Sequence, residues 1–139
     1  MVERVLLIDD DEINLMLCEM VLAQNAFAQK IIKLHDGQQG IDFYQDHATQ
    51  GPAEPVPNLI LLDLNMPIMN GWDFLDEFSA HYLTQFPKTR VVILSSSIDP
   101  LDVARAGQYP FVIEFLNKPL TDQAVHQLTM NQQLKQMLP

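Results

Sequence analysis

The sequence predicts an α/β protein with a doubly wound, five-stranded parallel sheet and helices on both faces of that sheet. Two observations predict this class. Short apolar runs alternate with helical or polar-turn segments, a pattern typical of parallel strands joined by right-handed crossovers. The first, third and fourth runs are also almost continuously aliphatic, as strands covered on both faces are. The expected strands are residues 4–8, 30–34, 58–62, 90–94 and 112–117.

The third expected strand ends in a single carboxylate, Asp63, which is followed by a turn containing Pro67 and Gly71. In open α/β sheets, ligands bind in the crevice outside the carboxyl ends of the strands. Asp63 therefore lies where a functional group is expected. For an isolated junction of this kind, an Asp that merely starts a turn is the simpler interpretation, but three other strand ends favour the functional one.

The first expected strand runs directly into four acids, residues 9–12, and a helix follows at once. Acids at this place suit the positive N-terminal end of a helix, so a capping role alone explains some of them. The apolar residues of the helix recur at the spacing of one helical face, which predicts the face that packs on the sheet. They are Ile13, Met16, Leu17, Met20 and Val21.

The fourth and fifth expected strands also end in polar residues. The fourth runs into three serines, 95–97, after which Asp99 is expected to cap a helix whose first residue is Pro100. The fifth is followed by Lys118 and then by a helix that Thr121 is expected to cap. Taken alone, the serines indicate a polar loop and the Lys a solvated surface residue.

Because all strands are expected to be parallel, the side chains at their carboxyl ends gather at one edge of the sheet. Two carboxylates about 4 Å apart repel by roughly 4 kcal/mol at an effective dielectric constant near 20, so converging acids need protons or a cation. Mg²⁺ prefers such oxygen ligands. One carboxylate can then act as a nucleophile toward phosphorus, with a Lys and a hydroxyl balancing and binding the phosphoryl oxygens. The residues expected at this edge are Asp9, Asp10, Asp63, Ser95 and Lys118.

These residues resemble those of the receiver domains of two-component response regulators, and the resemblance extends from about Val5 to the final helix. It implies a flavodoxin-like fold with strand order 2-1-3-4-5. It also implies that Asp63 is the phosphoacceptor. Asp9 and Asp10 resemble the paired metal-site acids, and the resemblance implies that Asp63 and the backbone carbonyl of Asn65 complete the metal shell.

The resemblance assigns roles to the residues around the phosphoacceptor as well. Ser95, Ser96 and Lys118 are expected to bind phosphate. Ser95 and Phe115 are expected to form a switch, in which the aromatic ring reorients on activation. The peptide bond between Lys118 and Pro119 is expected to be cis.

Composition agrees with a single domain, residues 1–139, without an output domain. The formal net charge is −10, with 8 Lys and Arg against 18 Asp and Glu. Nucleic-acid binding needs a basic footprint, so no nucleic-acid partner is expected. No apolar run reaches the roughly 18 residues of a membrane span, so we expect a cytoplasmic protein with no membrane partner.

Two further segments have an expected structure. The Pro-containing loop 48–57 is expected to be a stiff surface elaboration at the end of the sheet opposite the acids. The residues after Pro119 are expected to form one helix, with apolar residues at loose helical spacing. These are Ala124, Val125, Leu128, Leu134 and Leu138.

We therefore expect a stand-alone response regulator that takes a phosphoryl group from a sensor histidine kinase or a histidine phosphotransfer protein onto Asp63. Mg²⁺, or Mn²⁺ in its place, is the expected cofactor, and the output is contact with a downstream protein. The chain is not expected to be an enzyme beyond catalysing its own phosphorylation and dephosphorylation.

Two alternatives use the same residues. One is a phosphatase of the haloacid-dehalogenase type, which generally carries a second acid two residues after the nucleophile, where this chain has Asn65. The acidic pair also comes first in this chain rather than last. The other alternative is a pseudo-receiver that serves only as a binding scaffold, which the intact set of chemical positions disfavours.

Overall fold

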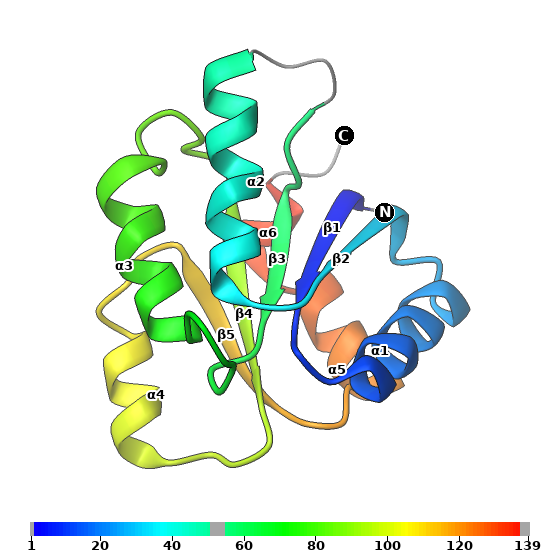
Figure 1. Ribbon diagram of the computed structural model, residues 1–139. Coiled ribbons are helices and arrows are strands. Elements are labelled where there is room, and N and C mark those ends of the chain that lie inside the picture. Colours follow the sequence, from blue (N-terminus) through cyan, green and yellow to red (C-terminus); the bar gives the residue numbers. More distant parts are fainter. Residues whose placement is uncertain (1, 51–54, 137–139) are drawn as a thin grey trace.

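The computed structural model of the chain describes residues 2–50 and 55–136. Five parallel strands form one sheet in the order β2-β1-β3-β4-β5, as predicted, with helices on both of its faces (Figure 1). The strands are β1 (Val2–Ile8), β2 (Ala28–Leu34), β3 (Leu59–Leu62), β4 (Arg90–Ser95) and β5 (Val112–Asn117). The helices are α1 (Glu12–Gln24), α2 (Gly37–Gln50), α3 (Gly71–His81), α4 (Pro100–Ala106), α5 (Asp122–Thr129) and α6 (Gln132–Lys135).

Two hydrophobic layers, one on each face of the sheet, explain why the central strands β3 and β4 are almost continuously aliphatic. In β1, Val5 and Leu7 pack with residues of α1, α5 and α6, whereas Leu6 and Ile8 pack with residues of α2, α3 and α4. All four side chains are at most 2% exposed. Burying an aliphatic side chain of this kind contributes roughly 1.5–3 kcal/mol, so both faces of the central strands stabilise the fold.

Two helices begin where the predicted cap residues placed them. Asp99 accepts a hydrogen bond from the backbone N–H of Leu101, and Pro100 is the first residue of α4. Thr121 likewise accepts from the N–H of Ala124 at the start of α5. Because both helices follow strands at the acidic edge, these caps fix where the chain leaves that edge.

The face that α1 turns to the sheet differs from the predicted one. Ile13 is 65% exposed and Met16 is 59% exposed, and Leu17 and Met20 are exposed as well. Of the predicted face, only Val21 packs against the core. The residues that α1 buries are Asn14, Leu15, Cys18 and Leu22.

The physical reason is that α1 is apolar around most of its circumference, so hydrophobic periodicity fits more than one face. Contacts at the start of the helix decide its rotation. The side chain of Asp11 accepts hydrogen bonds from the N–H groups of Ile13 and Asn14. The amide of Asn14 in turn binds Asp9 at the end of β1, which directs this side of the helix toward the sheet.

The expected single C-terminal helix is two helices. Asn131 interrupts it, and its side chain accepts hydrogen bonds from the N–H groups of Gln133 and Leu134, which caps the start of α6. Leu134 is fully buried against the layer of α1 and α5. Leu138 lies outside the described residues.

The loop expected over 48–57 begins later than predicted, because α2 continues to Gln50. Pro52 lies outside the described residues. The segment enters β3 at Leu59, at the end of the strand opposite Asp63, as expected (Figure 1). In the described part of the chain, none of the helices has the length and apolar character needed to cross a membrane.

Candidate functional site

Asp63 lies at the carboxyl end of the central strand β3 and is only 6% exposed. Its backbone N–H donates to the carbonyl of Ile8 on β1, which extends the strand pairing to this residue. The turn that follows Asp63 folds back against the backbone of this residue. A Cβ atom on Gly71 would lie 2.5 Å from the carbonyl oxygen of Asp63, so only glycine allows α3 to start against this backbone.

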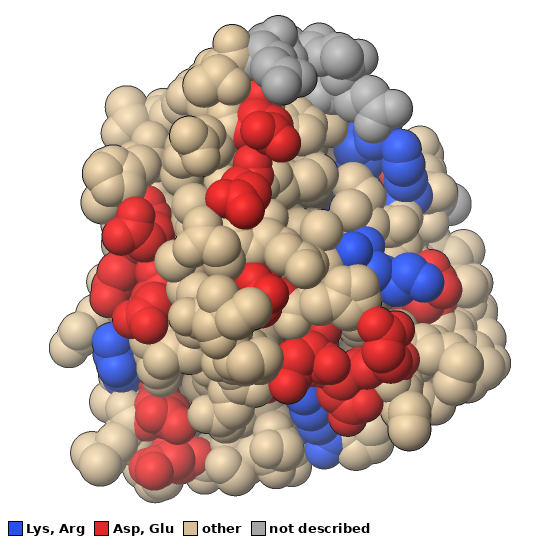
Figure 2. Space-filling model, viewed as in Figure 1, with Lys and Arg blue, Asp and Glu red and all other residues tan. Residues whose placement is uncertain are grey.

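Three carboxylates converge at this edge of the sheet, as the strand ends predicted. The side-chain oxygens of Asp9, Asp10 and Asp63 lie within 4.8 Å of one another. Asp9 and Asp63 are buried, whereas Asp10 is exposed to solvent. Figure 2 shows acidic side chains gathered in the region where α1 begins. The donor set consists of hard oxygen ligands around a partly open position, which fits a divalent cation such as Mg²⁺.

Lys118 supplies a positive charge to the two buried acids. Its Nζ lies 2.8 Å from an oxygen of Asp9 and 3.5 Å from an oxygen of Asp63. The backbone N–H of Lys118 donates to the carbonyl of Ser95 on β4. The bond between Lys118 and Pro119 is cis, as predicted.

The pKa values of Asp63 and Lys118 are both raised, but for different physical reasons. Burial raises the pKa of Asp63, and the negative charge of Asp9 raises it further. Lys118 and the backbone N–H of Asn65 lower the pKa of Asp63, but not enough to reverse the shift. Burial lowers the pKa of Lys118, yet the hydrogen bond to Asp9 and the charges of both acids outweigh it, and the net pKa is raised. Lys118 therefore stays protonated beside an acid that is reluctant to ionise.

The structure places the two predicted switch residues on neighbouring strands. Ser95 is buried at the end of β4, and its hydroxyl donates to the carbonyl of Ser97 at 2.9 Å. Phe115 lies on β5 opposite Ile93, and its half-buried ring packs against the layer of α2, α3 and α4. The hydroxyl thus holds the loop that follows β4, and its predicted role toward phosphate stays a prediction.

Two other predicted site residues are exposed. Ser96 is exposed next to the buried Ser95, and its predicted role in phosphate binding stays a prediction. Asn65 is exposed in the turn after β3, and its backbone N–H donates to the Asp63 carboxylate. The predicted part of its carbonyl oxygen in a metal shell stays a prediction.

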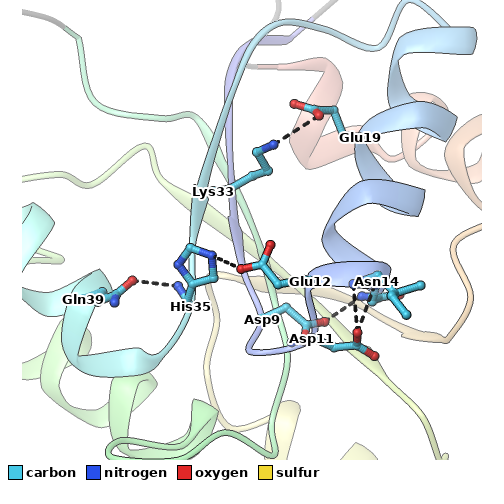
Figure 3. A network of polar contacts seen from close by, with 9 residues as sticks. Asp9, Asp11, Glu12, Asn14, Glu19, Lys33, His35 and Gln39 are labelled. Atoms are coloured by element: carbon cyan, nitrogen blue, oxygen red, sulfur yellow. Dashed lines mark hydrogen bonds and ion pairs between the residues drawn. The ribbon is translucent and has the colours of Figure 1, made fainter.

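Sequence reasoning missed one residue of this site, Asn14. Its Nδ2 donates to Oδ2 of Asp9 at 2.6 Å, and Figure 3 shows it reaching from α1 toward that carboxylate. The sequence does carry a signal, because Asn14 is the single amide in the otherwise apolar stretch 13–17. Assigning the wrong face to α1 left that amide in solvent.

Comparison with known proteins agrees with this geometry. The family model of the response regulator receiver domain matches residues 5–130. The response regulator Rcp1 of Synechocystis is 35% identical over 101 residues, which cover 71% of this chain and 65% of Rcp1. The probable methanogenesis regulatory protein FilR2 of Methanothrix harundinacea is 30% identical over 118 residues, which cover 84% of this chain and 72% of FilR2.

Solved structures show the same relationship. A two-component response regulator from Cytophaga hutchinsonii has a TM-score of 0.83 and 33% identity, over 93% of this chain and 95% of that one. The Mn²⁺-bound form of Rcp1 has a TM-score of 0.73 and 27% identity, over 92% of this chain and 90% of the other. Sequence, fold and site geometry agree, and the chain belongs to the family of response regulator receiver domains.

Proposed function

We propose that this chain is a phosphorylation-controlled switch of two-component signalling, in which Asp63 accepts a phosphoryl group in the presence of Mg²⁺. The observation that carries the proposal is the meeting of three carboxylates and one ammonium group at one edge of the sheet. Membership of the receiver family supports it and favours a receiver over the phosphatase alternative.

The proposed donor is the phosphohistidine of a sensor histidine kinase or a histidine phosphotransfer protein. In the transfer, a carboxylate oxygen of Asp63 attacks phosphorus, and the bond from phosphorus to the donor nitrogen breaks. The electron pair of that bond stays on the imidazole, and the product is an aspartyl phosphate. The chain acts on no separate substrate and catalyses only its own phosphorylation and dephosphorylation.

The chain's own residues position the charges for this step. Lys118, already within 3.5 Å of Asp63, balances the charge of the phosphoryl oxygens. Ser95 can donate to a phosphoryl oxygen once it releases the carbonyl of Ser97. The cation would be held by the carboxylates of Asp9, Asp10 and Asp63 and by the carbonyl of Asn65. When bound, a divalent cation neutralises the acids and the phosphoryl oxygens.

Mg²⁺ is the proposed cation, and Mn²⁺ is a possible substitute, which the Mn²⁺-bound structure of the related Rcp1 supports. The proposed output is a changed protein-interaction surface that a downstream protein recognises. The surface consists of α4, β5 and α5, because Ser95 and Phe115 lie at its margin.

Incubation with acetyl phosphate and Mg²⁺, followed by intact-mass spectrometry, tests the proposal. One added phosphoryl group is expected in the wild-type protein, and none in Asp63→Asn. Asp46→Asn, which changes an exposed acid on α2, is the matched control and should be labelled like the wild type. Full labelling of Asp63→Asn would contradict the assignment, and no labelling of the wild type would favour the binding-scaffold alternative.

A further inference from the structure

Asn14 is a buried polar residue on a helix face that is otherwise apolar. It is 7% exposed and shares the inward face of α1 with Leu15, Cys18 and Leu22. Burying an amide costs free energy unless the amide is hydrogen-bonded, so packing alone does not favour Asn here. Its bond to Asp9 is short, at 2.6 Å, as charge-assisted hydrogen bonds are. The amide is therefore directed at the acidic cluster.

Three donors hold the Asp9 carboxylate. Oδ2 accepts from the amide of Asn14 on α1 and lies 2.8 Å from Nζ of Lys118, which follows β5. Oδ1 accepts from the backbone N–H of Asp11 at 2.9 Å. A carboxylate offers about four acceptor positions. Among the described residues, these contacts use both positions of Oδ2 and leave one on Oδ1.

The chemistry of an amide suits this place better than that of a charged side chain. An amide donates a hydrogen bond to Asp9 without neutralising its charge. The negative charge therefore stays available to bind a cation. An acid at residue 14 would bring a further carboxylate against Asp9, which already lies beside Asp10 and Asp63. A Lys would instead compete with the cation for Asp9.

We propose that Asn14 is a positioning residue, whose buried amide holds the Asp9 carboxylate in the orientation that binds the divalent cation. The inference rests on the proposed function, because it concerns the cation of the same site. Partners that orient metal ligands from behind typically change metal affinity by about ten- to hundredfold when they are removed.

Calorimetric titration of Mg²⁺ into Asn14→Leu tests this role directly. Leu keeps a similar volume on the apolar face but cannot donate to Asp9. We expect Mg²⁺ affinity to fall about tenfold or more. Asn14→Ala, measured in parallel, should show the same loss, and circular dichroism shows which variants are folded.

Asn25→Ala is the matched control. The amide of Asn25 donates to the carbonyl of Val21 and to the carboxylate of Asp122 at the far end of α1. Its removal therefore weakens the attachment of α1 without touching Asp9, and Mg²⁺ affinity should stay at the wild-type value. If the role of Asn14 were purely structural, the Asn14 and Asn25 variants would both keep the wild-type Mg²⁺ affinity.

Phosphorylation by acetyl phosphate gives a second readout. In the Asn14 variants, the Mg²⁺ concentration for half-maximal rate should rise, while the rate at saturating Mg²⁺ stays close to that of the wild type. Wild-type Mg²⁺ affinity in a folded Asn14→Leu or Asn14→Ala protein would overturn the inference and leave the proposed function intact. A wild-type protein that binds no Mg²⁺ would contradict both.

Discussion

Asp63 is buried, although the proposed attack on phosphorus requires its ionised form. Burial and the charge of Asp9 raise its pKa above the ordinary value for a carboxyl group. Its ionisation is therefore less favourable in the folded chain than in the unfolded one. A buried acid of this kind reduces stability at neutral pH, as groups at functional sites often do.

This predicts that Asp63→Asn is more stable than the wild type at neutral pH. With a raised pKa, the stabilising contribution of Asp63 is fully present below the unfolded value, near 3.9, and is lost as pH rises through the folded value. Asn never ionises, so its advantage should grow from acid to neutral pH. Urea unfolding in the presence of a chelator measures this difference.

Asp46→Asn serves as the control, because this acid is exposed on α2. Its effect on the free energy of unfolding should be within about 0.5 kcal/mol at every pH. An Asp63→Asn protein that is less stable than the wild type at neutral pH would show that Lys118 more than offsets the burial of Asp63.

At the residue scale, strand ends were predictable and helix faces were not. Asp9, Asp63 and Lys118 each follow an apolar run, and the parallel topology brings such ends to one edge whatever the details of packing. Asn14 is different, because its place depends on the rotation of α1 about its own axis. That rotation brings Asn14 into hydrogen-bond contact with Asp9, which no local pattern reports.

At the scale of elements, α1 illustrates the same limit. Its sequence fits a helix with several apolar faces, so its existence follows from the residues, but its buried face follows from contacts with the sheet. The C-terminal segment shows the same limit. Its apolar spacing continues past Met130, but Asn131 caps a new helix there. In both places, a polar side chain favours one of the arrangements that hydrophobic periodicity allows.

The corrected face of α1 predicts unequal costs for neighbouring substitutions. Leu15→Ala removes a side chain that is 2% exposed and should lower the free energy of unfolding by about 2–5 kcal/mol. Met16→Ala changes a residue that is 59% exposed and should cost about 0.5 kcal/mol or less. Denaturant unfolding of both variants measures the difference. Equal costs would support the face that periodicity first suggested.

A cluster of four side chains attaches α4 to α3. The guanidinium carbon of Arg105 lies 4.4 Å from the ring centroid of Trp72, and the hydroxyl of Tyr109 donates to Asp76. The rings of Trp72 and Tyr109 are stacked, with centroids 6.2 Å apart. On α4 itself, Ala106 is the buried residue. The position of this short helix therefore depends strongly on the cluster.

Arg105→Ala should loosen α4 without unfolding the protein. A cation–π contact at an exposed site contributes about 0.5–1 kcal/mol, so hydrogen exchange of the α4 amides should speed up by about two- to fivefold. Lys135→Ala, which also removes a basic residue from the last turn of a helix, is the control and should leave α4 unchanged. Unchanged exchange in Arg105→Ala would mean that Trp72, Tyr109 and Asp76 hold α4 without Arg105.

For the whole molecule, the proposed switch requires more free energy than one contact supplies. Moving a population from 1:99 to 99:1 takes about 5.5 kcal/mol, whereas a hydrogen bond contributes about 1 kcal/mol net. In the proposed switch, Ser95 would therefore transmit only part of the signal to Phe115 across the pairing of β4 and β5. The cation, Lys118 and backbone donors would share the rest.

Ser95→Ala should accordingly separate phosphorylation from response. The variant should still accept phosphate on Asp63, but NMR shifts across 101–115 should be smaller than in the phosphorylated wild type. Ser79→Ala, at an exposed position on α3, should give the full pattern. If Ser95→Ala also gives the full pattern, the response reaches Phe115 by a route that does not include this hydroxyl.

The most direct test of the whole proposal is to locate the phosphoryl group by chemistry. Borohydride reduces an aspartyl phosphate to homoserine, so peptide mapping after phosphorylation and reduction marks the acceptor residue. The proposal predicts homoserine at residue 63, and its loss when Mg²⁺ is chelated before acetyl phosphate is added. Homoserine at residue 9 or 10, or a phosphorylated protein with no homoserine, would contradict it.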